Sequence, residues 1–315
     1  MKTPINLIEF IDLLWTEEES LLYLEGKKWW WVCPKCWNEK YWRHKKRRVR
    51  ICASCKTSLC VTAWTVLHWT RLPIRKILLI VWFMIQSKQW ISSEELALML
   101  WIDEKTAWLW TTKIRKIMTL DNRTKLSWNV EVDEVFIWWK GEIIRWRGAK
   151  WKVKVVIAVE INAENKNKKG LFRWMWRVRT KIIPNCSEKT LTKFILENVE
   201  KESVIYTDWW LWYKNIYTSW YVHIVEKKWV LDDEISWINR NEVTPNIHII
   251  ASLIKRWLLW THQKYIVNKS YFQDYLEEYT FRFNRRHSND RWKLFDTIID
   301  QILSHKPTTR KQISS

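Results

Sequence analysis

Two closely spaced pairs of cysteines near the N-terminus constrain the fold of this chain more than any other feature of its sequence. The pairs are Cys33 with Cys36 and, after fifteen intervening residues, Cys52 with Cys55. Two short knuckles at this spacing present four thiolates to one tetrahedral Zn²⁺, as in a zinc ribbon. We therefore predict a zinc ribbon over residues 26–62. His44 could replace one thiolate, but it lies among basic residues and is expected to face solvent or phosphate.

The cysteines and the apolar segments also bear on the compartment. Cytosolic thiols are kept reduced, so paired cysteines favour metal binding over disulfides. The longest apolar stretch, residues 77–85, is shorter than the roughly 20 residues that span a bilayer. The first residues carry acids within their apolar run and lack a small-residue cleavage site, so no secretory signal is expected. We predict a cytoplasmic protein with no membrane partner.

The charge of the chain points to a polyanionic partner. Lys and Arg number 54 against 34 Asp and Glu, which gives a formal net charge of +20 and a pI of about 9.7. Such a balance favours nucleic acid as the partner. The length of 315 residues allows one large domain or two to three small ones.

Glycine and tryptophan occur in unusual numbers. Typical usage predicts roughly 22 glycines in a chain of this length, yet there are 4 beside 29 tryptophans. Several tryptophans stand where a backbone usually needs glycine, namely Trp37, Trp138, Trp139, Trp146, Trp209 and Trp212. We hypothesise that the gene comes from a lineage that reads UGA as glycine and that its UGA codons are printed here as tryptophan. The alternative is a protein whose many indoles stack on DNA bases.

The segment between the ribbon and residue 125 has a helical pattern. Pro73 opens one helix, a capping box over residues 92–95 opens a second, and Asp103 caps a third. The second and third read as helix, short turn, helix. We predict a helix-turn-helix over residues 63–125, with Lys113 and Arg115 on the helix that enters the major groove. An ordinary αα-hairpin is the alternative.

From about residue 126 the pattern changes to strands. NVEVDEVFI, KVKVVIAVEI and FRWMWRVR read as three strands, and the helical SEKTLTKFILENVEK separates them from a fourth, SVIYTD. The chain is helical again after Pro245. We predict an α/β domain over residues 126–305, a tail over 306–315 and a short amphipathic helix over 1–25.

Two aspartates in this domain carry the chemistry. Asp133 lies within the first predicted strand, and Asp208 closes the fourth. Carboxylates in such places are costly to desolvate without a cation beside them, although a single strand-end Asp is often only a turn cap. Two that meet on adjacent strands favour Mg²⁺ or Mn²⁺, which take oxygen ligands. Two such ions about 4 Å apart can promote an in-line phosphoryl transfer.

A family resemblance extends this interpretation to nearly the whole chain. The motifs that carry it are VEVDE, IWWKG, RWRGAK, VIAVE, YTDWWLWY, KRWLLWTHQ and YLEEYTFRFNRR, together with the cysteine pairs and TAWTVLHWT. With the tryptophans noted above taken as glycine, they resemble the ISXO-type group of bacterial insertion-sequence transposases. The resemblance implies a ribonuclease-H-like catalytic domain with a DDE-type metal site. It also implies cleavage of the ends of a mobile element, strand transfer into target DNA, and a homo-oligomer that pairs two ends.

The resemblance also assigns the site residues. Asp133 and Asp208 match the first two metal ligands of the group, whereas His248 stands where many relatives have an acid or an amide. Lys255 follows seven residues later, so on a helix it shares a face with His248. If His248 is instead a capping or core residue, a nearby acid would complete the site. The candidates are Glu242, Asp232, Asp233 and Glu234.

The remaining basic residues of the C-terminal part suggest DNA contacts. Arg256 is expected to grip the DNA backbone, and three arginines are expected to clamp phosphates or to form a solvated basic face. They are Arg282, Arg285 and Arg286. Two other functions stay open: a non-enzymatic regulator that binds DNA through the zinc ribbon and helix-turn-helix, and a structure-selective nuclease on the same fold.

Overall fold

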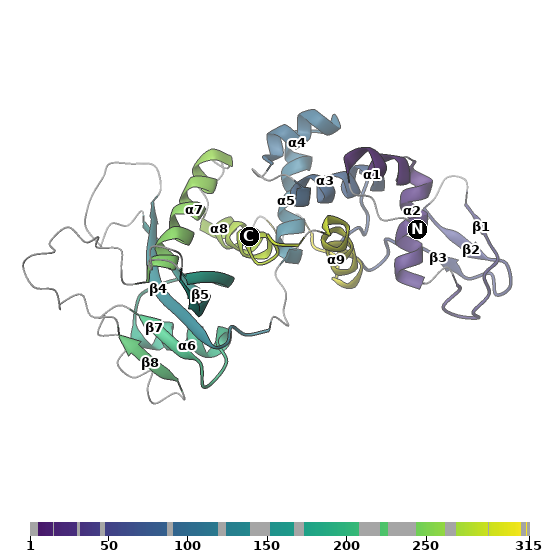
Figure 1. Cartoon of the computed structure of the whole chain (residues 1–315). Coiled ribbons are helices and arrows are strands. Elements are labelled where there is room, and N and C mark those ends of the chain that lie inside the picture. The colour runs from purple at the N-terminus through teal and green to yellow at the C-terminus, as the bar shows by residue number, and fades with distance from the viewer. Residues whose placement is uncertain are drawn as a thin grey trace, which may run out of the picture. The chain divides into compact units, whose positions relative to one another are not determined.

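A computed structural model divides the chain into two compact units (Figure 1). Unit 1 comprises Met1–Met118 and Ser288–Ser315, and unit 2 comprises Thr119–His287. The structure describes residues 6–14, 16–29, 32–44, 48–86, 91–118, 124–138, 152–166, 173–207, 221–225, 244–261, 269–288, 290–309 and 313. The sequence assigned residues 288–305 to the α/β domain, whereas the structure groups them with the N-terminal unit.

Unit 1 combines a small antiparallel sheet with a helical core. Its strands are β1 (Tyr41–Arg43), β2 (Arg50–Cys52) and β3 (Ser58–Leu59), with β2 in the centre. Its helices are α1 (Leu7–Leu13), α2 (Glu17–Trp29), α3 (Ile74–Gln86), α4 (Ser93–Leu100), α5 (Glu104–Met118) and α9 (Arg291–Ser304). Phe10 stacks on Trp82 at 4.3 Å between ring centroids, and Trp292 and Phe295 of α9 join the same aromatic cluster. This cluster explains why α9 belongs to unit 1.

The N-terminal segment forms two helices where the sequence predicted one. Thr16 and Glu19 make a reciprocal cap: Thr16 N–H donates to Glu19 Oε2 at 2.7 Å, and Glu19 N–H donates to Thr16 Oγ1 at 3.1 Å. This capping box starts a new helix. The acidic run over residues 17–19 therefore forms the first turn of α2, where it is stabilised by the helix dipole.

Helices α4 and α5 begin at the predicted caps. Ser92 Oγ accepts the N–H of Glu95 at 3.0 Å, and Asp103 Oδ2 accepts the N–H of Thr106 at 3.3 Å. Between the helices, Trp101 is the C-cap of α4 in the left-handed region, at φ 50° and ψ 59°. The short turn that the sequence predicted is thus confirmed. None of the described helices is both long and apolar enough to cross a membrane.

Unit 2 is built on a mixed five-stranded sheet. Its elements are β4 (Asn129–Trp138), β5 (Lys152–Lys166), β6 (Arg173–Ile183), α6 (Glu188–Asn198), β7 (Val204–Thr207), β8 (Val222–Val225), α7 (Pro245–Thr261) and α8 (Lys269–Phe283). The strand order is β6-β5-β4-β7-β8, and β5 runs antiparallel to the other four strands. The predicted order of three strands, a helix and a strand is confirmed. The sequence did not predict β8, which has only four residues.

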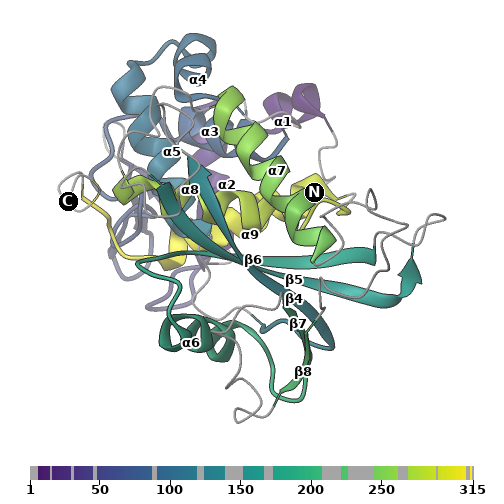
Figure 2. The same cartoon turned by 90° about the vertical axis from the view of Figure 1, so that its left-hand side faces the viewer.

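Helices cover both faces of this sheet. Leu191 and Phe194 of α6 pack with Val130 and Val132 of β4 in one buried cluster. Helices α7 and α8 lie on the opposite face, as Figure 2 shows. Because successive side chains of a strand point to opposite faces, the odd-numbered residues of β4 point toward α7.

The tryptophans fall into two structural classes. Among the described residues, eight non-glycine residues have positive φ, and five of them are tryptophans. The five are Trp37, Trp64, Trp69, Trp101 and Trp128, and each is at least 77% exposed. Trp82, by contrast, is 1% exposed within the core. Of the positions singled out in the sequence, Trp139, Trp146, Trp209 and Trp212 lie outside the described residues, and Trp138 ends β4.

Candidate functional site

The four cysteines of the ribbon come together as the spacing predicts. One knuckle precedes β1 and the other follows β2. The sulfur of Cys33 lies 3.7 Å from that of Cys55, and the sulfur of Cys36 lies 3.4 Å from that of Cys52. All four Sγ atoms lie within 4.8 Å of one another. Tetrahedral Zn²⁺ with bonds of about 2.3 Å separates its sulfurs by about 3.8 Å, so the donor set fits zinc.

The two knuckles have the same backbone geometry. Trp37 N–H donates to Cys33 O at 2.8 Å, and Lys56 N–H donates to Cys52 O at 3.1 Å. Trp37 and Lys56 have φ of 59° and 57°. Within the described part of the chain, the four cysteines are the only group of three or more residues placed to share a metal. His44 is not in this group.

Electrostatics at the second knuckle favours a metal-binding thiolate. Hydrogen bonds from the side chain and the backbone of Thr57 lower the pKa of Cys55 to about 6. A thiolate, not a thiol, is the zinc ligand. The lowered pKa of Cys55 therefore favours the form of this sulfur that binds zinc.

In unit 2, Asp133 of β4 is held at the start of α7. Asp133 is 8% exposed, and its odd-numbered position in β4 places its side chain on the face that α7 covers. Its Oδ1 accepts the N–H of Glu134 at 2.7 Å, and its Oδ2 accepts the hydroxyl of Thr244 at 3.1 Å. Thr244 directly precedes the first residue of α7. The carboxylate predicted as a metal ligand is thus oriented by donors to both of its oxygens.

A second carboxylate of β4, Glu131, was not predicted. It lies on the same face as Asp133, two residues earlier, and is 2% exposed. Its Oε2 accepts the backbone N–H groups of Asn246 at 3.1 Å and Ile247 at 3.3 Å, and its Oε1 accepts the Asn246 side-chain amide at 2.7 Å. The alternation of acids in VEVDE was the available signal, because it places both acids on one face of the strand.

The predicted residues of α7 line a common pocket. His248, Lys255 and Arg256 border a hollow of about 450 Å³, together with Val135 of β4 and the α7 residues Ala251, Ser252 and Leu259. His248 is exposed, and burial lowers the pKa of Lys255. Val135 is two residues from Asp133 on the same face of β4. The structure therefore brings His248, Lys255 and Arg256 to one pocket beside the strand that carries Asp133.

Asp208 lies outside the described residues, as do the alternative acids Asp232, Asp233, Glu234 and Glu242. The described part of β7 ends at Thr207, whose hydroxyl lies 2.7 Å from His223 Nε2 of β8. Tyr206 pairs in parallel register with Glu131. The described end of β7 therefore lies beside the segment of β4 that carries the two acids.

The three arginines at the C-terminal end of α8 and just beyond it make contacts within unit 2. Arg286 donates to the carbonyls of Met175, Trp176 and Phe283, and burial lowers its pKa. The Arg285 guanidinium lies 3.9 Å from the centre of the Phe281 ring. Arg282 Nη1 lies 3.7 Å from Glu278 Oε1. The contacts of Arg286 connect the end of α8 to β6, whereas Arg285 and Arg282 contact residues of α8 itself.

The basic residues predicted on the DNA-binding helix differ in exposure. Arg115 is 1% exposed and donates to Thr111 Oγ1 at 3.3 Å. Lys113 Nζ lies 4.8 Å from the centre of the Trp110 ring, and burial lowers its pKa. Lys105, in the first turn of α5, is exposed. The exposed basic charge of α5 therefore includes its N-terminal turn, the part of a recognition helix that contacts bases.

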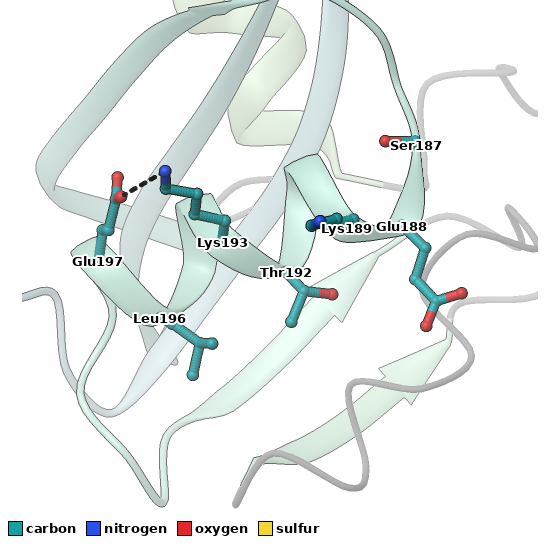
Figure 3. A pocket seen from close by; sticks show the side chains of 7 residues that line it. All are labelled: Ser187, Glu188, Lys189, Thr192, Lys193, Leu196 and Glu197. Atoms are coloured by element: carbon teal, nitrogen blue, oxygen red, sulfur yellow. Dashed lines mark ion pairs between the residues drawn. The ribbon is translucent and has the colours of Figure 1, made fainter.

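A larger hollow lies along α6, on the other side of the sheet. Its volume is about 670 Å³, and Figure 3 shows the seven residues that line it. They are Ser187, Glu188, Lys189, Thr192, Lys193, Leu196 and Glu197. Lys193 and Glu197 form an exposed ion pair at 3.9 Å across one turn. Since Asp133 and His248 lie on the α7 face, size alone does not locate the site.

Comparison with known proteins assigns unit 2 to a class of nucleic-acid-processing enzymes, the DDE transposases. The family described as the ISXO2-like transposase domain matches residues 125–284, which is just over half of the chain and nearly all of unit 2. The chain therefore belongs to the ISXO2-like transposase family, and membership implies DNA as a partner. No curated protein matches the chain.

Proposed function

We propose that this protein cleaves the ends of an insertion sequence and joins them to target DNA, using divalent metal held by Asp133, Asp208 and His248. The observation that carries the proposal is the hydrogen bond between Asp133 and Thr244. It fixes the first predicted ligand to the start of the helix that bears His248 and Lys255. Residues that are 111 positions apart in the chain are thus in contact, which supports a shared site.

The topology of unit 2 supports a ribonuclease-H-like fold for this site. In chain order the strands are arranged 3-2-1-4-5, and the second runs antiparallel to its neighbours. Helix α6 connects the third strand to the fourth. In this arrangement the first strand is central, which places Asp133 in the middle of the sheet with α7 directly over it.

The chemistry of the residues suits a hard metal ion. Asp133 offers an oriented carboxylate, and Asp208 and His248 are the further ligands that we propose. When bound, Mg²⁺ or Mn²⁺ would supply an activated water and stabilise the leaving oxygen of the phosphodiester. Lys255 and Arg256 would hold the phosphate of the DNA strand in the pocket. Thr244 would keep Asp133 oriented. The freed 3′-OH of the element would then attack a phosphodiester of the target DNA, and the 3′-oxygen of the target strand would leave as the new bond forms.

Replacement of Asp133 or Asp208 by Asn tests this proposal. Each change removes a metal ligand without changing side-chain size, so Mg²⁺-dependent cleavage of end DNA should disappear while DNA binding persists. Asp300→Asn in unit 1, an exposed acid paired with Lys27, is the matched control and should cleave normally. Cleavage that persists in Asp133→Asn would overturn the assignment. Binding by the wild type without any nicking would favour the non-enzymatic regulator.

DNA binding by unit 1 is proposed on the zinc ribbon and on the exposed first turn of α5. In unit 2, Arg256 lines the α7 pocket and is proposed to contact phosphate there. Three further arginines are proposed to contact phosphate in addition to their contacts within the unit, namely Arg282, Arg285 and Arg286.

We also infer a homo-oligomer on paired ends. Sedimentation with and without end DNA tests it, and a monomer bound to DNA would contradict it.

We further propose that the exposed tryptophans with positive φ are glycines in the living organism, encoded by UGA. Their backbone angles and exposure support this, because a left-handed conformation is costly for an indole-bearing residue and routine for glycine. UGA is expected at Trp37, Trp64, Trp69, Trp101 and Trp128, and UGG is expected at the buried Trp82. Peptide masses from the native host test the prediction, and UGG codons at the five positions would exclude it.

A further inference from the structure

We propose that Glu131 is a positioning residue, which caps α7 and so fixes His248 and Lys255 relative to Asp133. This inference rests on the proposed function. Glu131 is buried beside the site, but both of its oxygens already accept hydrogen bonds from the first turn of α7. It therefore acts on the site through the helix rather than as a further ligand.

The physical basis is the unsatisfied N-terminus of a helix. The first N–H groups of α7 have no carbonyl partner within the helix, and the helix dipole places partial positive charge there. The Glu131 carboxylate accepts the N–H of Asn246, and it shares the N–H of Ile247 with the carbonyl of Thr244, which lies at 3.1 Å. In turn, the N–H groups and the partial positive charge of the helix start offset the free-energy cost of burying the Glu131 carboxylate. The helix dipole and the hydrogen bonds to Glu131 thus both favour the position in which α7 begins beside Glu131 of β4.

Two anchors hold this helix start. Glu131 contacts Asn246 and Ile247, and Asp133 contacts Thr244. Residues two apart on one strand are separated by about 7 Å, so the two acids grip the helix start at separate points. A single contact would permit rotation about it, whereas two define the direction of the helix. His248 is the residue directly after the doubly anchored segment.

The backbone at Thr244 shows that this geometry is imposed. Thr244 has φ of 58°, which is unusual for a β-branched residue. Such conformations persist where the surroundings hold them. Thr244 directly precedes Pro245, the first residue of α7, and its side-chain hydroxyl donates to Asp133. Loss of the Glu131 cap should therefore allow the helix start to relax away from Asp133.

Unit 1 provides a matched control for helix capping itself. Glu17 caps α3 from a distance in the chain: its Oε1 accepts Ile74 N–H at 3.0 Å and its Oε2 accepts Arg75 N–H at 3.2 Å. Glu17→Gln removes the same type of cap from a different unit. An effect seen in Glu131→Gln and absent from Glu17→Gln is therefore not a general consequence of a lost cap.

The test uses the full chain with Mn²⁺ as probe and two readouts beside cleavage of end DNA. Hydrogen exchange measures the amides of residues 246–248, and electron paramagnetic resonance measures Mn²⁺ affinity. Glu131→Gln should accelerate exchange there and weaken Mn²⁺ affinity or cleavage by about 10- to 100-fold, as for other residues that orient metal ligands. Glu17→Gln should change neither. Asn246→Ala, which removes only one of the three hydrogen bonds, should give a smaller effect of the same kind.

The outcomes separate this inference from the proposed function. If Glu131→Gln and Asn246→Ala keep wild-type Mn²⁺ affinity and cleavage, the positioning role is overturned, even when exchange at α7 is faster. If Glu17→Gln reproduces the loss, the effect is one of general stability and the inference is also overturned. Cleavage that persists in Asp133→Asn would instead overturn the proposed function.

Discussion

The zinc ribbon and the Asp133 site gather their polar groups in opposite ways. The ribbon takes its ligands from two knuckles, and Cys33 meets Cys55 across only 22 positions of the chain. Asp133 meets Thr244 across 111 positions, through a central strand and a helix on its face. Spacing alone therefore specifies the ribbon. The Asp133 site forms only once the whole sheet has formed, and it depends on contacts such as those of Glu131 with the first turn of α7.

The largest expected effect is that of zinc removal on the ribbon. Structural zinc contributes on the order of 10 kcal/mol to the folding of small zinc domains. A chelator or Cys52→Ser should therefore unfold residues 33–59 while the exchange protection of unit 2 is retained. Metal analysis and hydrogen exchange measure both. Cys60→Ser is the control and should keep one zinc per chain, and zinc retained by Cys52→Ser would contradict the four-thiolate site.

Loss of the hydrogen bond from the Thr244 hydroxyl to Asp133 should give the next largest effect. Thr244→Val keeps the side-chain shape but removes the hydroxyl that donates to Asp133, and a hydrogen bond to a charged group contributes about 1.5–3 kcal/mol. We expect cleavage to fall at least tenfold with the zinc content unchanged. Thr244→Ser keeps the hydroxyl and should stay near wild type. Equal cleavage by the Val and Ser variants would show that cleavage does not need this hydrogen bond.

The pH dependence of DNA binding tests Lys255. Burial lowers its pKa, and its ammonium can bind phosphate only while protonated. Its contribution should be present below that lowered pKa and lost as pH rises through it. At neutral pH, Lys255→Met should weaken end-DNA binding about tenfold, and the difference should vanish at alkaline pH. Lys255→Arg should keep affinity there, because a guanidinium stays charged; a constant difference across pH would contradict this role.

The smallest effect concerns the first knuckle of the ribbon. In the printed sequence, Trp37→Gly should stabilise the ribbon by about 1 kcal/mol, because it relieves a left-handed conformation. Trp42→Gly in β1 is the matched control and should destabilise it by about 0.5–1 kcal/mol, since glycine weakens a strand. Zinc affinity measured by competition with a chelator reports both. The same sign for both substitutions would refute the role assigned to Trp37.

Features set by neighbouring residues were predictable from the sequence. The caps at Ser92 and Asp103 each depend on a few consecutive positions, and the cysteine cluster depends on one regular spacing across 22 positions. The helix boundary at Thr16 was equally local, as a Thr-x-x-Glu capping box, but it was missed. The helical phase that places His248 and Lys255 on one face also followed from spacing alone.

Other features required tertiary structure. Strand β8 is too short for its alternation to be distinctive, and α9 joins unit 1 through aromatic contacts with Phe10 and Trp82 that no local pattern contains. The role of Glu131 depends on which helix covers β4. Arg115 shows the same limit, because its position on the helix suggested a DNA contact, whereas packing within the chain buries it.

A change of metal preference at position 133 tests the central claim most directly. Asp133→Cys replaces a hard oxygen ligand by a soft thiolate, which Mg²⁺ binds poorly and Mn²⁺ accepts more readily. If Asp133 binds the catalytic metal, the variant should fail to cleave end DNA in Mg²⁺ and regain cleavage in Mn²⁺, whereas Asp133→Asn should remain inactive in both. Wild-type cleavage by Asp133→Cys in Mg²⁺ would contradict the account.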